Sequence, residues 1–167
     1  KSATAPPAPP MPPAPPAPPA TSAEATPLTG EALAQKIASL AEGLYLDDFG
    51  SEGGMGFSPF HAAAKLTTLT ADTFRATLGL GDGPKQQPRK FEPADRALQR
   101  LIDVAEWEDR REQGAEVVRY MQANLREIIA TVLGPYDPEQ GAEYPVYIAG
   151  IDAAGNLVGL KSAAIWT

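Results

Sequence analysis

The chain has 167 residues, a formal net charge of −7 and no cysteine. An acidic chain is poorly suited to gripping nucleic-acid phosphates, so we expect no direct nucleic-acid binding. Without cysteine there are no disulfides or thiolate metal sites, and no apolar run approaches the roughly 20 residues that a membrane-spanning helix needs, so no membrane partner is expected.

Residues 1–27 differ sharply in composition from the rest. They hold 11 of the 18 prolines, mostly as repeated Ala-Pro-Pro units. Such repeats favour extended polyproline II and cannot build a core. We expect residues 1–27 to be a disordered spacer and residues 28–167 to form one domain. A ligand for a proline-recognising module is the alternative for this segment, although no flanking Arg or Lys orients the repeats.

The sequence pattern in the first half of the domain predicts two helices and two strands. Thr29 is a candidate N-cap and Leu33, Ile37 and Leu40 recur at helical spacing, so a helix is expected over residues 29–42, ended by Gly43. We expect glycine at Gly43, and at Gly155 further on, to adopt a backbone conformation that other residues avoid. The remaining elements are strands over residues 44–46 and 57–63, the second broken by Pro59, and a helix over residues 70–78.

Residues 47–56, DDFGSEGGMG, carry four glycines and three acids. The carboxylates of Asp47, Asp48 and Glu52 are hard ligands of the kind that divalent metals prefer, but their spacing matches no EF-hand loop, so a solvated turn is favoured. Together with His61, the single histidine, they also define an alternative function as a carboxylate-dependent hydrolase. No motif demands that reading, and a structural role is favoured for the histidine.

The second half predicts a loop over residues 79–89, a helix opened by Pro93, and a long helix over residues 113–133. Trp107 stands in a stretch with six acids against two arginines, between residues 103 and 116. Such a stretch is typical of a solvated helix face, but an aromatic among acids is also typical of an interface anchor. The apolar stripe that predicts the long helix consists of Val117, Met121, Leu125, Ile128 and Val132.

The last residues predict a β-hairpin, with arms over residues 146–151 and 157–166 and the turn DAAGN between them. Both arms are apolar on both faces, so we place them inside a sheet covered by helices. Trp166 and Thr167 would then stand at a strand tip, either as a functional end or simply as the end of the strand. The order of elements predicts an α/β fold, a layered sandwich with a mainly antiparallel sheet.

Three stretches resemble the nuclease A inhibitor family, small acidic bacterial proteins: ALAQKIASLAEGLY in the first helix, WEDRREQGAEVV from Trp107 to Val118, and VYIAGIDAAGNLVGLKS before a terminal Thr. The likeness covers roughly residues 28–167. Residues 1–27 have no counterpart, residues 59–88 match loosely, and the acidic loop is longer than the family pattern. The resemblance implies a three-layer α/β/α sandwich that is not an enzyme and inhibits sugar-non-specific, metal-dependent nucleases by plugging their clefts.

Carried onto this chain, the resemblance assigns the terminal residue, Thr167, to the catalytic Mg²⁺ or Mn²⁺ held by the nuclease, so the inhibitor has no cofactor of its own. Glu52 is the supporting acid, with Asp48 as its rival, and Trp107 contributes at the rim, with Trp166 beside the terminus. A monomer alone and a one-to-one complex with the nuclease are expected. The alternative is an adaptor domain on a proline-rich tether, without inhibitory activity.

The compartment is left open by the sequence. The lack of cysteine favours the cytoplasm, whereas a signal peptide removed before Lys1 would place the protein in the periplasm or outside the cell.

We predict that residues 1–27 are dispensable for folding, because they show no amphipathic pattern. Deleting them should leave the thermal midpoint nearly unchanged. A drop of more than ~4 °C, about 1 kcal/mol for a domain of this size, would contradict the prediction.

Overall fold

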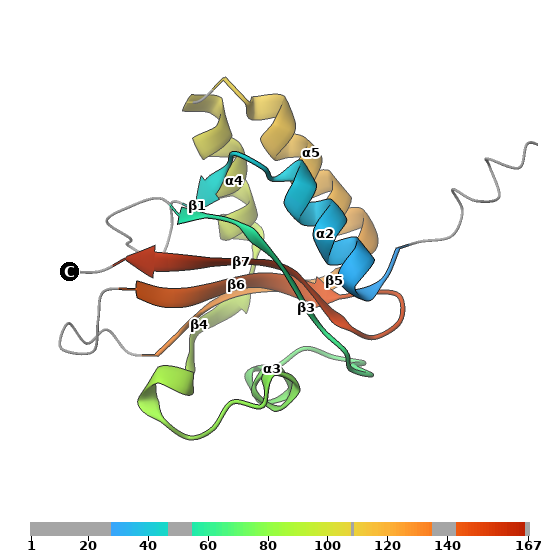
Figure 1. Cartoon of the computed structure of the whole chain (residues 1–167), viewed down its shortest axis with the longest axis vertical. Coiled ribbons are helices and arrows are strands. Elements are labelled where there is room, and N and C mark those ends of the chain that lie inside the picture. Colours follow the sequence, from blue (N-terminus) through green and yellow to red (C-terminus); the bar gives the residue numbers. More distant parts are fainter. Residues whose placement is uncertain (1–27, 47–54, 108, 135–142, 166–167) are drawn as a thin grey trace, which may run out of the picture.

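The computed structural model describes residues 28–46, 55–107, 109–134 and 143–165, and Figure 1 shows their arrangement. A five-stranded antiparallel sheet has the strand order β3-β7-β6-β5-β4, and β1 pairs with β2 in a separate two-stranded hairpin. The elements are α2 (Gly30–Leu40), β1 (Tyr45–Leu46), β2 (Met55–Gly56), β3 (Ser58–Ala62), α3 (Ala71–Leu78), the short 3₁₀ helix η1 (Pro84–Gln86), β4 (Pro88–Pro93), α4 (Asp95–Trp107), α5 (Arg111–Asn124), β5 (Arg126–Leu133), β6 (Glu143–Ile151) and β7 (Leu157–Ile165).

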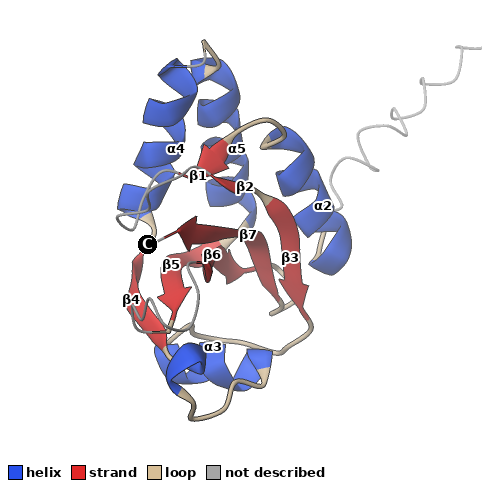
Figure 2. Ribbon diagram, turned by 60° about the vertical axis from the view of Figure 1, so that its left-hand side comes forward, coloured by secondary structure: helices blue, strands red, loops and turns tan. Residues whose placement is uncertain are grey.

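Helices cover both faces of the sheet, so the fold is the expected three-layer α/β/α sandwich. Helices α2, α4 and α5 lie on one side and α3 lies on the other, as both views show (Figures 1 and 2). Strand β6 alternates accordingly: Val146 and Ile148 belong to the core under the three helices, and Tyr147 and Ala149 belong to the core under α3. Because β6 and β7 are both interior strands, the placement of the terminal hairpin inside the sheet is confirmed.

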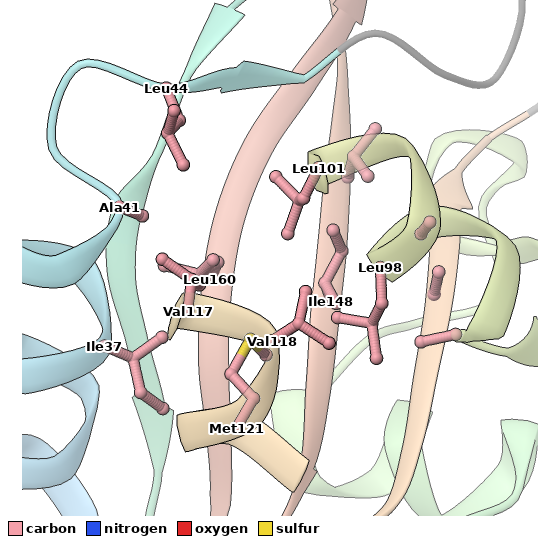
Figure 3. Close-up of a cluster of buried hydrophobic side chains, with 14 of the residues drawn as sticks. Ile37, Ala41, Leu44, Leu98, Leu101, Val117, Val118, Met121, Ile148 and Leu160 are labelled. Atoms are coloured by element: carbon pink, nitrogen blue, oxygen red, sulfur yellow. The ribbon is translucent and has the colours of Figure 1, made fainter. Parts of the chain in front are cut away.

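The larger core lies beneath the three helices (Figure 3). Each helix contributes fully or almost fully buried side chains at helical spacing, and these pack onto Ile148 and Leu160 of the two central strands. Helices α4 and α5 approach closely because Gly114 has no side chain: a Cβ there would lie 2.9 Å from the Ala105 Cβ and 2.9 Å from the Leu101 carbonyl oxygen. The helical members labelled in Figure 3 are Ile37, Leu98, Leu101, Val117, Val118 and Met121.

The smaller core lies beneath α3 and is dominated by aromatic rings. Phe74 of α3 is fully buried, and its ring makes edge-to-face contacts with Tyr147 at 5.4 Å and with Phe91 at 5.9 Å between ring centroids. The expected N-cap at Thr70 is confirmed, since its hydroxyl accepts a hydrogen bond from the Thr73 amide. One short helix therefore closes this face of the sheet.

The single helix expected over residues 113–133 is wrong. Helix α5 ends at Asn124, Leu125 is extended (φ −127°, ψ 147°), and residues 126–133 form β5. The helical stripe was real as far as Met121. Beyond it the chain is rich in β-branched residues and is buried on both faces of the sheet, so apolar side chains fall by chance at helical spacing.

Strand β4 was also missed, because residues 79–89 were expected to be a loop and Pro93 to open a helix. Pro88 and Pro93 instead begin and end an edge strand, a position that tolerates proline because one side of the strand has no pairing partner. The register with β5 shifts between Arg89 and Glu92, and Lys90 there has φ +50°. The edge strand is therefore strongly bulged.

The DAAGN turn of the terminal hairpin is built around the carboxylate of Asp152, which is 2 % exposed. Its Oδ1 accepts hydrogen bonds from the amides of Ala154 (2.8 Å) and Asn156 (2.9 Å). Its Oδ2 accepts from the amide of Gly30 at the start of α2 (2.7 Å) and from the Asn156 side chain (3.2 Å). The carboxylate thus ties the sheet to the first helix.

Both positions where glycine was expected have a left-handed backbone, with φ +85° at Gly43 and φ +88° at Gly155. At Gly155 the fit is also tight, because a Cβ would lie 3.2 Å from the backbone of Lys65 and Leu66. The Gly155 carbonyl accepts a hydrogen bond from the Leu66 amide (2.8 Å). The turn therefore also fixes the segment that leads from β3 to α3.

We predict that Asp152→Ala destabilises the fold by about 3 kcal/mol, because it leaves buried backbone donors without an acceptor. Asp152→Asn should cost less, since one oxygen remains. Urea denaturation followed by circular dichroism measures the loss. Asp82→Ala, which removes an exposed carboxylate paired with Arg75 on the surface, is the control and should leave the midpoint nearly unchanged. An equally small effect of Asp152→Ala would contradict this account of the turn.

Candidate functional site

One end of the sheet gathers the described ends of several segments that carry the predicted site. Ile165, the last described residue of β7, pairs with Glu143, the first residue of β6. Strand β5 ends and β4 begins at the same end, where Leu133 pairs with Pro88. In Figure 1 the end of β7 and the start of β6 lie on the left, near β1. Residues 166–167 therefore follow directly from this end of the sheet.

The β1–β2 hairpin is the stem of the acidic loop. Leu46 pairs with Met55 and Tyr45 with Gly56, so residues 47–54 connect the two short strands. The Ser162 hydroxyl of β7 lies 3.1 Å from the Met55 carbonyl oxygen and 2.9 Å from that of Gly56. A serine hydroxyl has one hydrogen, so the two carbonyls share it as acceptors. This contact fastens the stem to the terminal strand three residues before Ile165.

The structure thus brings together the attachment points of two predicted segments, but not the predicted side chains themselves. Asp48, Glu52, Trp166 and Thr167 lie outside the described residues, as do the other residues between 47 and 54. Trp107 is the last residue of α4, and its side chain is likewise not described. What can be placed is the framework from which these residues start.

A shallow hollow of about 330 Å³ lies beside the stem at this end of the sheet. It is lined by residues of β2, β3, β6 and β7. Its charged members are Glu143 and Lys161, both exposed. The Lys161 ammonium lies 5.5 Å from the centroid of the Tyr147 ring, so it is held over an aromatic face rather than directed at the stem. The hollow is an open surface feature that suits contact with another macromolecule better than enclosure of a small substrate.

His61 lies apart from this end. It is exposed on the edge strand β3 and pairs with Val158, near the start of β7, whereas the sheet end described above is at Ile165. Within the described ranges, no group of three or more His, Asp or Glu side chains is placed to hold a metal. Among the helices that the structure describes, none is long and apolar enough to cross a bilayer.

Ser162 is a residue at this end that the sequence analysis did not single out. Its partners are more than 100 residues earlier in the chain, so no local pattern could have revealed the contact. The available signal was weaker: a hydroxyl at a position whose neighbours along the same face, Leu160 and Ala164, are buried and apolar. A polar residue on such a face needs a partner.

Comparison with models of known protein families found no match for this sequence. A search of curated proteins likewise found no significant match. The family resemblance therefore rests on the sequence stretches quoted above.

We predict that Ser162→Ala loosens the stem without unfolding the sheet. Losing one shared hydrogen bond costs about 1 kcal/mol, so protected amides of β1 and β2 should exchange with solvent about fivefold faster relative to those of β6. Hydrogen exchange followed by NMR measures the ratio. The control is Ser58→Ala, whose hydroxyl makes a long 3.4 Å contact with the Lys161 carbonyl. Equal exchange in both variants would show that the Ser162 contact does not hold the stem.

Proposed function

We propose that the protein inhibits a sugar-non-specific, metal-dependent nuclease by inserting the end of its sheet into the active-site cleft. The single observation that carries the proposal is the contact of Ser162 with Met55 and Gly56, which fixes the stem of the acidic loop beside the end of the terminal strand. A loop bearing acids and a terminal strand can then be presented to one partner surface together.

The chemistry of the presented groups matches such a cleft. A nuclease that cleaves phosphodiesters has a basic cleft with a divalent cation, and the open coordination positions of that cation take oxygen ligands. Thr167 would supply a hydroxyl or carboxylate oxygen to the metal. Glu52, or Asp48 in its place, would occupy the position of a substrate phosphate, and Trp107 and Trp166 would add apolar contact around the acids.

The net charge of the chain supports the same proposal through the rate of encounter. An excess of seven negative charges attracts a basic partner over a distance of about 10 Å at moderate salt and speeds association. The described framework adds rigidity, since both arms of the terminal hairpin are interior strands. A rigid presenting strand loses little conformational freedom on binding, which favours affinity.

We predict that removing Thr167, or adding a few residues after it, weakens inhibition about thirtyfold. Losing an oxygen at the centre of an interface costs on the order of 2 kcal/mol. Glu52→Ala should cost a similar amount and Asp48→Ala less, and raised salt should slow association without abolishing it. The measurement is the inhibition constant against a sugar-non-specific, metal-dependent nuclease, with circular dichroism confirming the fold.

Glu92→Ala is the matched control, because Glu92 is an exposed acid on β4 that the proposal does not use. It should leave the inhibition constant unchanged. If deleting Thr167 also leaves that constant within a factor of two, the strand tip is only an end and the adaptor function becomes the better proposal. A pull-down from a lysate then tests the adaptor directly, because an inhibitor should retain a basic nuclease and an adaptor need not.

A further inference from the structure

A groove of about 590 Å³ lies between the C-terminal half of α2 and the segment that enters β3. Helix α2 and β3 run side by side in both views (Figures 1 and 2). The apolar part of the lining includes Tyr45 and Phe57, whose side chains are half-buried, and Pro59, which is exposed. Two partly exposed aromatic residues and an exposed proline therefore line one shallow groove.

The chemistry of this lining fits a polyproline II segment. Proline-rich ligands dock in aromatic-lined grooves, where each prolyl ring packs against an aromatic face. A prolyl residue has a carbonyl acceptor but no amide donor, so its groove should supply donors. The lining residues Tyr45 and Gln35 carry such donors, a hydroxyl and a side-chain amide. The side-chain nitrogen of Gln35 donates one of its two hydrogens to Glu31 Oε1 (3.1 Å), so its second hydrogen can be donated to another acceptor.

We propose that this groove binds the proline-rich segment of the same chain, residues 5–19. The segment is long enough: residues 20–27 separate it from Leu28 and span roughly 25 Å when extended. Along the direction of α2, the groove begins at Gln35, about 8 Å from Gly30, and ends near Gly43, about 20 Å from Gly30. The segment can therefore turn back along α2 and lie in the groove.

Tethering makes weak binding sufficient. A short linker gives an effective concentration on the order of millimolar, so even a sub-millimolar affinity fills the groove for most of the time. The thermal midpoint is expected to stay nearly unchanged when residues 1–27 are deleted, and this sets an upper limit on how much docking can stabilise the fold. If the docked state outweighs the free state about fourfold, docking contributes RT ln 5, about 1 kcal/mol. The inference does not depend on nuclease inhibition, because its test follows the position of the proline-rich segment, although the groove shares Tyr45 and Gly56 with the stem of the acidic loop.

The test uses the full chain and its lack of cysteine. Ala14→Cys provides one attachment point for a spin label inside the proline-rich segment, and signal loss is measured for each backbone amide by NMR. Amides that line the groove, such as those of Ser39, Tyr45 and Gly56, should lose intensity selectively and independently of protein concentration. Amides around Phe91 and Glu127, which line a different pocket, should not. Uniform or absent loss would overturn the proposal.

Two variants and a mixture complete the design. Replacing the prolines of residues 6–19 by Gly and Ser at constant length should abolish the selective loss without touching the domain. Tyr45→Ala should also abolish it, whereas Tyr120→Ala, the same change at a half-buried tyrosine of α5 outside the groove, should not. A mixture tests whether a second copy of the chain fills the groove instead. Chains that carry the spin label but no isotope label are mixed with chains that carry the isotope label but no spin label. Signal loss seen mainly in this mixture would mean that the segment of a second copy occupies the groove, and would overturn the intramolecular assignment.

Discussion

The architecture depends on one buried carboxylate. Asp152 would be costly to bury alone, because an ion loses its hydration in the interior. Four hydrogen-bond donors replace that hydration, and one of them, the Gly30 amide, lies at the N-terminus of α2, where the helix dipole also favours negative charge. The same turn holds the chain after β3 through Asn156, whose side-chain oxygen accepts from the Ala64 amide at 3.2 Å. Helix, hairpin and the approach to α3 are thus assembled around a single side chain.

The two ends of the terminal hairpin are built differently, and this difference supports a division of roles. At the Asp152 end, backbone and side-chain hydrogen bonds converge on one turn. At the other end, β7 reaches Ile165 with Ser162 as a lateral attachment for the stem of the acidic loop. Nine residues of β7 span about 30 Å. The hairpin can therefore act as a rigid arm, anchored in the core at one end and presenting groups at the other.

Elements with local signals could be predicted from the sequence, and elements defined by long-range contacts could not. The helix that follows Thr70 is marked by a cap whose hydrogen-bond partner, Thr73, is three residues away, and the terminal hairpin is marked by the glycine of its turn, Gly155. Strand β5 was mistaken for a helix because burial on both faces removes the alternation that marks a strand. At the candidate site, the sequence indicated the terminal strand and the acidic loop, but their connection through Ser162 exists only in the folded chain.

The two edge strands of the sheet have a consequence for how copies of the chain meet. An edge strand exposes unpaired amides and carbonyls, and a flat one can recruit the edge of another molecule and so begin aggregation. Here β3 carries Pro59, which cannot donate to a neighbouring strand. Strand β4 is bounded by two prolines, carries charged side chains and is bulged near Lys90. Both edges of the described sheet thus carry features that oppose the pairing of one copy's sheet with another's.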